Sequence, residues 1–206
     1  AAALFLIIGV GLFVVQRRTE PPVSQHTGSE KDRSSSMLRQ PVVRTLALFM
    51  LAQGVIVGVI DVASVAFATA QGQPGMASVV LSFYALGSCA MGLLFGTLRL
   101  QMPLSRQIVW VGASVAISAL PLLLASNLTA LTLAVLLAGI TFGPTITVAM
   151  SLVEQQVQAN RLTEGMTWLL TGLASGVALG AAAAGWLIDH WGAQQSFVLT
   201  LLAGGA

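Results

Sequence analysis

Charged residues are scarce in this chain. Of its 206 residues only 8 % are Asp, Glu, Lys or Arg, whereas 56 % are hydrophobic. A soluble domain averages about 25 % charged residues, so these side chains are too few to cover a globule of this size. The apolar residues gather into runs of about 20, the length of a membrane-spanning helix, and lack the alternating polarity of a membrane β-strand. The sequence therefore excludes a soluble globule and predicts an all-α membrane protein.

Residues that carry chemistry are equally sparse. The one cysteine, Cys89, rules out an internal disulfide bond. No serine stands in a nucleophile elbow, no His-Glu-x-x-His pattern occurs, and no glycine-rich loop ends in a phosphate-binding lysine. The basic residues lie scattered in loops without an aromatic platform. We expect no enzyme activity, catalytic residue, metal or cofactor, and no nucleic-acid partner.

The apolar runs divide the chain into a linker and six spans. Both ends lie inside apolar runs, so we expect a fragment of a larger membrane protein, with residues 1–16 as the end of a preceding transmembrane helix. Residues 17–44 are polar and predict a linker. Residues 45–206 predict a transmembrane bundle with antiparallel neighbours, because the breaks between spans are short. Its helices are expected at about 45–70, 76–98, 107–125, 128–150 and 162–188, with a truncated one at 194–206.

The nine Lys and Arg residues indicate the orientation. They lie in the linker, in the break at 99–106 and at Arg161, and the alternate breaks contain none. The positive-inside rule places such loops on the cytoplasmic side. The chain is thus predicted to be a multi-pass protein of the cell (inner) membrane, surrounded by the lipid bilayer, with its linker in the cytoplasm.

The first complete span carries a carboxylate, Asp61, in its middle third. A charge at that depth costs roughly 2.5–3.5 kcal/mol on insertion scales, so the fold must compensate it. On a helical wheel, Gln53, Ser64 and Asp61 fall within an arc of roughly 80°. Asp61 is either a group that gains and loses a proton in a water-accessible cavity, or a structural carboxylate bonded to a neighbouring helix or near the outer mouth. Gln53 and Ser64 bond either a substrate or the next helix.

Small residues recur at helical spacing in several spans. They predict ridges at which two helices approach closely. One span also contains a proline, which removes a backbone donor and predicts a kink or a flexible point. The residues are Gly54 and Gly58; Ser88, Gly92 and Gly96; Gly139, Gly143 and Pro144; and Gly172, Gly176 and Gly180.

Three polar or aromatic residues stand at the start of the longest span. Glu164 follows Arg161, and a negative residue in a first helical turn interacts favourably with the helix dipole. The alternative for this pair is a cytoplasmic gate that contacts another half of the protein. Trp168 either lines a cavity or anchors the helix near the membrane interface.

Three segments resemble a known family. DVASVAFATAQG at 61–72, AGITFGPTITVAMSLVEQQV at 138–157 and NRLTEGMTWLLTGLASGVALGAAAAGWLIDHWGA at 160–193 resemble the seventh, tenth and eleventh helices of major facilitator superfamily transporters, most closely the bacterial drug-efflux-type permeases. The resemblance implies the C-terminal half of a 12-helix fold, whose partner is a missing N-terminal six-helix half. It also implies alternating access, a small-molecule substrate and protons as the coupling ion.

The expected function is therefore proton-coupled export of small, fairly apolar organic compounds. Two alternatives remain open at this point: an importer or uniporter of a sugar or metabolite with the same fold, and a non-transporting membrane subunit. Asp61, Gln53, Ser64 and Trp168 are the candidates for the substrate and proton pathway. The helix-packing or gate candidates are Arg161, Glu164, Pro144 and the glycines at 54, 58, 139, 143, 172, 176 and 180.

Overall fold

The computed structural model describes residues 40–97, 104–123, 125, 127–191, 200 and 203–204. The chain divides into two units, residues 1–36 and 37–206, and every described residue belongs to the second. The predicted helix end at 1–16 and nearly all of the predicted linker lie outside the described residues. The same holds for most of the predicted last span at 194–206.

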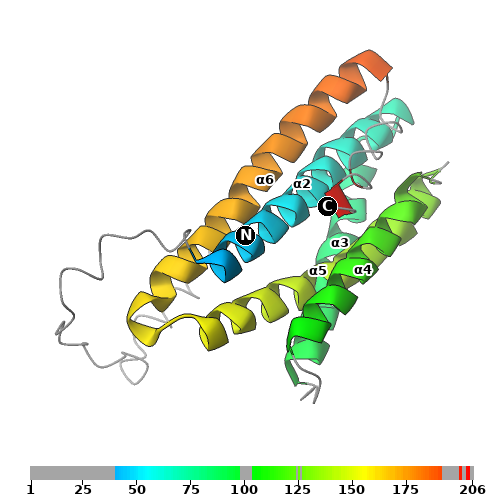
Figure 1. Ribbon diagram of the computed structural model, residues 1–206. Helices are drawn as coiled ribbons and strands as arrows, with labels where there is room; N and C mark the ends of the chain where they lie inside the picture. The colour runs from blue at the N-terminus through cyan, green and yellow to red at the C-terminus, as the bar shows by residue number, and fades with distance from the viewer. Residues whose placement is uncertain are drawn as a thin grey trace, which may run out of the picture. The chain divides into compact units, whose positions relative to one another are not determined.

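Every regular element of the described residues is a helix (Figure 1). The chain forms α2 (Pro41–Ala70), α3 (Met76–Thr97), α4 (Leu104–Leu123) and α5 (Leu128–Gln156), then the short 3-10 helix η4 (Ala159–Arg161) and α6 (Leu162–Trp191). Helix α6 lies along α2, and α3 and α4 both pack against α5. The all-α prediction is confirmed.

Four segments are long and apolar enough to cross a membrane. They are α2, α3, α5 and the stretch Ala159–His190, whereas the apolar part of α4, Val109–Leu123, is shorter. Each of the first five predicted spans thus corresponds to a helix. Because the sixth lies largely outside the described residues, the count of six stays a prediction.

The helix boundaries differ from the predicted ones at polar residues. Helix α2 begins at Pro41, four residues inside the predicted linker, with the proline at the start where its missing N–H costs nothing. Helix α5 continues past residue 150 through Glu154 to Gln156. Hydropathy ends with the apolar run, but backbone hydrogen bonds continue into polar residues beyond it. For the same reason α6 reaches Trp191 instead of residue 188.

Turn chemistry explains two helix ends. After α2 the chain reverses through 71–75, where Gly72 adopts φ of +72°, a left-handed conformation that glycine reaches without strain. Asn127 caps the start of α5, because its side-chain oxygen accepts a hydrogen bond of 2.8 Å from the amide of Ala130.

Glycine brings α2 and α6 into backbone contact. A Cβ on Gly54 would lie 2.9 Å from the amide nitrogen of Val177, and one on Gly176 would lie 2.9 Å from the Cα of Gly54. Real side chains essentially never come so close, so only glycine permits this approach. Gly58, Gly172 and Gly180 meet backbone atoms of the facing helix in the same way.

A second backbone contact joins α3 and α5. A Cβ on Gly143 would lie 2.9 Å from the Cα of Gly92, and one on Gly139 would lie 3.0 Å from the carbonyl carbon of Tyr84. The contact does not extend to Gly96, where an added Cβ would meet nothing within 4 Å. The predicted ridge on α3 therefore ends at Gly92.

Pro144 lies buried inside α5, which runs through it as one helix. Proline cannot donate to the carbonyl four residues earlier, which is that of Ile140. The nearby threonine hydroxyls bond other carbonyls: Thr141 donates to Ala138 at 2.8 Å and Thr145 donates to Thr141 at 2.6 Å. These bonds do not replace the one that Pro144 removes.

Candidate functional site

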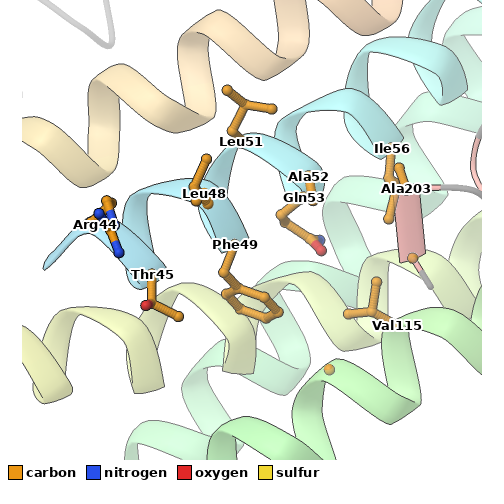
Figure 2. A pocket seen from close by; sticks show the side chains of 12 residues that line it. Arg44, Thr45, Leu48, Phe49, Leu51, Ala52, Gln53, Ile56, Val115 and Ala203 are labelled. Carbon is orange, nitrogen blue, oxygen red and sulfur yellow. The ribbon is translucent and has the colours of Figure 1, made fainter. Parts of the chain in front are cut away.

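A pocket of about 580 Å³ runs along the first half of α2 (Figure 2). Binding sites for small molecules typically measure about 300–1,000 Å³. The opposite wall comes from Gly112 and Val115 of α4 and from Ala203 and Gly204. The α2 residues that line it are Arg44, Thr45, Leu48, Phe49, Leu51, Ala52, Gln53 and Ile56. Most of these side chains are apolar, so the pocket suits the body of a small organic molecule.

Gln53 supplies a buried polar group to this pocket. Only 3 % of the residue is exposed, and its side chain extends from α2 into the pocket (Figure 2). The amide makes no hydrogen bond within the described part of the chain. Its amide atoms are not among the fully buried, unpartnered atoms of the described residues, so they remain accessible from the pocket. A bound molecule or water with a donor or acceptor can therefore hydrogen-bond to them.

Arg44 stands at the other end of the same wall. It is exposed and lies about 13 Å from Gln53 along the helix axis, at about 1.5 Å per residue. Phe49 and Leu48 fill the interval between them. Along its length the pocket thus presents first a cation, then an apolar wall, and then an amide.

Asp61 lies two turns beyond Gln53 and does not line this pocket. It is half-buried and lies within electrostatic range of Tyr84 of α3. The Tyr84 ring in turn packs against Phe142 of α5, with ring centroids 5.8 Å apart. No Lys, Arg or His of the described residues forms an ion pair with Asp61. The carboxylate therefore sits at the approach of α2 to α3.

Ser64 is fully buried one turn after Asp61. Its Oγ has no hydrogen-bond partner in the described portion of the chain. It also does not line the pocket around Gln53. The three residues that share an arc of the α2 wheel therefore lie in three different surroundings.

The start of α6 carries a local ion pair. The Nη2 of Arg161 donates to Oε2 of Glu164 at 2.8 Å, and its Nε donates to the same oxygen at 3.2 Å. Glu164 lies in the first turn of α6, as predicted. Trp168, one turn further, is partly buried against an apolar cluster that includes Val43, Met50 and Leu169.

Possible metal ligands are scattered over the helices that the structure describes. Among the described residues, no group of three His, Cys, Asp or Glu side chains could hold an ion. Asp189 and His190 are neighbours in the last turn of α6, where the His190 Nδ1 lies 2.8 Å from the Trp186 carbonyl oxygen. That ring also packs against the ring of Trp186, with centroids 4.6 Å apart and planes tilted by 31°.

Several residues of the site were not predicted from the sequence. Tyr84 is the one tyrosine of the chain, and its rarity could have marked it as a candidate. Phe49 stands four residues before Gln53, hence on the same face of the helix. Val115 and Ala203 carry no such signal, because they reach the pocket only through the packing of distant segments.

Long apolar helices that pack through glycine and enclose a partly polar pocket define a multi-pass helical membrane protein. The family model of the Major Facilitator Superfamily matches residues 62–206 of the chain. The chain therefore belongs to the Major Facilitator Superfamily and is a membrane transporter, which confirms the resemblance at the level of the superfamily. No curated protein and no solved structure matches the chain.

Proposed function

We propose that this protein is a secondary active transporter that works by alternating access and exports small, fairly apolar organic compounds in exchange for protons. The observation that carries the proposal is the amide of the largely buried residue Gln53, which has no hydrogen-bond partner among the described residues and lines a pocket of about 580 Å³. Its apolar walls favour an apolar substrate body, and the amide favours a substrate with one hydrogen-bonding group. Trp168 and Ser64 belong to the same pathway in this proposal.

Asp61 is the proposed coupling group. The described helices carry three further acids, Glu154, Glu164 and Asp189, each within the last or first two turns of its helix. Asp61 alone lies about two and a half turns from a helix end, at roughly 3.6 residues per turn. A charge at such a depth is costly, and acids in that position commonly carry protons through transporters.

The linker, a second half of the transporter and the helix contacts complete the proposed transporter. In a protein of the cell (inner) membrane, residues 17–44 lie on the cytoplasmic side, with 17–40 as the linker and 41–44 as the first turn of α2. An N-terminal six-helix half completes the transporter. The Arg161–Glu164 pair lies at the cytoplasmic end of α6, where it contributes to a gate. The glycine contacts and Pro144 set which helices move together.

Transport by the full-length protein in proteoliposomes tests the direction and the coupling. An inward proton gradient is imposed across vesicles loaded with the lipophilic dye ethidium, and dye efflux is followed by fluorescence. Efflux that rises with the gradient supports proton-coupled export. Uptake of a sugar or metabolite without any dye efflux would favour the importer. No transport of any of these compounds would favour a non-transporting subunit.

Two variants assign the residues. Gln53→Leu is expected to raise the KM for dye about tenfold, since one hydrogen bond to a buried group is worth roughly 1–1.5 kcal/mol. Asp61→Asn is expected to leave downhill dye movement and to remove its dependence on the proton gradient. Unchanged KM in the first variant would remove Gln53 from the substrate site, and unchanged coupling in the second would assign the proton to another residue.

A further inference from the structure

A second pocket, of about 490 Å³, lies between α3, α4 and α5. It shares no residue with the pocket around Gln53. Its walls include Met91 and Phe95 of α3, Trp110 and Ser114 of α4 and Pro144 of α5, with Gln107 at one end. We call it the α3–α5 groove.

The α3–α5 groove opens toward the outside of the helix bundle. Trp110 lines it and is 69 % exposed, and its neighbour Val109 is 68 % exposed. Leu93 and Leu94 of α3 are exposed as well. In a protein that crosses a membrane, such apolar surface faces lipid tails, so the groove is accessible from the bilayer.

The groove is short enough to lie within one half of a membrane. Its residues on α4 run from Gln107 to Ser114, a rise of about 10 Å at about 1.5 Å per residue. Half of a hydrocarbon core measures about 15 Å. On α3 the groove begins at Met91 and ends at Phe95, near the end of that helix. One acyl chain of a single leaflet fits this length.

A cation stands at the end of the groove. Arg106 is exposed, precedes Gln107 and lies one helical turn before Trp110, hence on the same face of α4. It forms no ion pair with the described residues. The described parts of α3 and α4 contain no Asp or Glu. Helix α5, which also lines the groove, carries one acid, Glu154, in its last turn, and this acid forms no ion pair with Arg106.

From this juxtaposition we propose that the α3–α5 groove binds one anionic phospholipid. The acyl chain lies between α3, α4 and α5, and the phosphate group sits on Arg106, with the Trp110 ring at the headgroup level. Cationic side chains near a membrane surface attract anionic lipids, and tryptophan prefers the membrane interface. This site is independent of the proposed substrate pocket.

Native mass spectrometry of the full-length protein tests the site. The purified protein is mixed with equal amounts of phosphatidylglycerol and phosphatidylcholine that carry the same acyl chains. The expected result is an approximately fivefold preference for phosphatidylglycerol, from the attraction of one basic residue. Equal binding of the two lipids would overturn the proposal.

Substitutions separate the charge from the groove. Arg106→Gln is expected to bring the preference close to one, while Arg106→Lys keeps it. Arg44→Gln is the matched control, because it removes an exposed charge at the start of another helix and should leave the preference unchanged. A preference that survives Arg106→Gln, or that falls equally in Arg44→Gln, would overturn the assignment to this groove.

The acyl chain needs a test of its own. Ser114→Phe fills the groove and is expected to reduce the binding of both lipids severalfold, with a circular dichroism spectrum like that of the parent protein. Thr141→Leu fills it from α5 and should act alike. Soluble glycerol phosphate, which has the headgroup charge without a chain, should not displace bound phosphatidylglycerol. Full lipid binding in both filled variants, or displacement by glycerol phosphate, would refute the groove as the site.

Discussion

Replacing Gly176 by alanine probes the backbone contact between α2 and α6. The new Cβ would lie 2.9 Å from the Cα of Gly54 and 2.9 Å from the carbonyl carbon of Leu51. Carbon atoms in good contact lie about 3.5–4.0 Å apart. Since both neighbours are backbone atoms, no side-chain rotation relieves the overlap. The carbonyl oxygen of Leu51 would lie closer still, so the two helices must separate locally by about 1 Å or more.

The expected cost follows from two opposing effects. Extra methyl groups in a packed interior typically cost about 1–3 kcal/mol. Alanine in turn favours a helix over glycine by about 1 kcal/mol. A control on the same helix cancels the second effect: at Gly185 an added Cβ would meet nothing within 4 Å. Gly176→Ala is therefore expected to be about 1–3 kcal/mol less stable than Gly185→Ala.

Reversible unfolding in mixed micelles measures this difference. Both variants are purified in one detergent and titrated with dodecyl sulfate, and helix content is followed by circular dichroism. Stabilities that agree within about 0.5 kcal/mol, the usual range of a neutral surface change, would show that α2 and α6 do not meet at Gly176. A double variant with Gly54→Ala should cost less than the sum of the single ones, because both open the same gap.

Three further outcomes are expected. Ser64→Ala should leave the free energy of unfolding unchanged or raise it by up to about 1 kcal/mol in the same titration, because it removes a buried hydroxyl without a partner; a clear loss would reveal a bond to that hydroxyl. Glu164→Gln, which removes one charge of the partly exposed pair with Arg161, should change stability by less than about 1 kcal/mol, and a larger loss would indicate a buried role. Cysteine at Gln73 should react with an impermeant maleimide on intact cells, whereas cysteine at Gln158 should react only after permeabilisation; labelling of both on one side would contradict the predicted topology.

The helices were predictable from the sequence because lipid leaves a backbone few choices. Apolar runs of sufficient length must satisfy their own hydrogen bonds, and the helix is the local way to do so. The ends were less predictable, as Pro41 and Gln156 show. Hydropathy marks where lipid contact stops, and a helix stops only where its hydrogen bonds or caps end. The glycine spacing also anticipated Gly54 and Gly176, although not that these two face each other.

The candidate site was less accessible to sequence reasoning. A helical wheel places Gln53 and Asp61 on similar faces of α2, but it does not say which element lies opposite at each level. The pocket that Gln53 lines is closed by Val115 of α4 and Ala203, whereas Asp61 lies within electrostatic range of Tyr84 of α3. These partners come from tertiary packing over long sequence separations. The local sequence determines which polar residues α2 carries, but it does not determine which residues surround them.

The four longest helices pack as two pairs, α2 with α6 and α3 with α5. The contacts within each pair differ from the contacts between the pairs. Within α2–α6 and within α3–α5, glycine lets backbone meet backbone, so a shift of one helix along its partner would drive main-chain atoms together. The contact of α2 with α3 has no glycine of this kind among the described residues, and Asp61 of α2 lies within electrostatic range of Tyr84 of α3. A boundary that carries a charge and few interlocked backbone atoms is easier to move than one packed to the main chain. This arrangement favours motion between the pairs over motion within them, which places the proposed proton site at the boundary that would move.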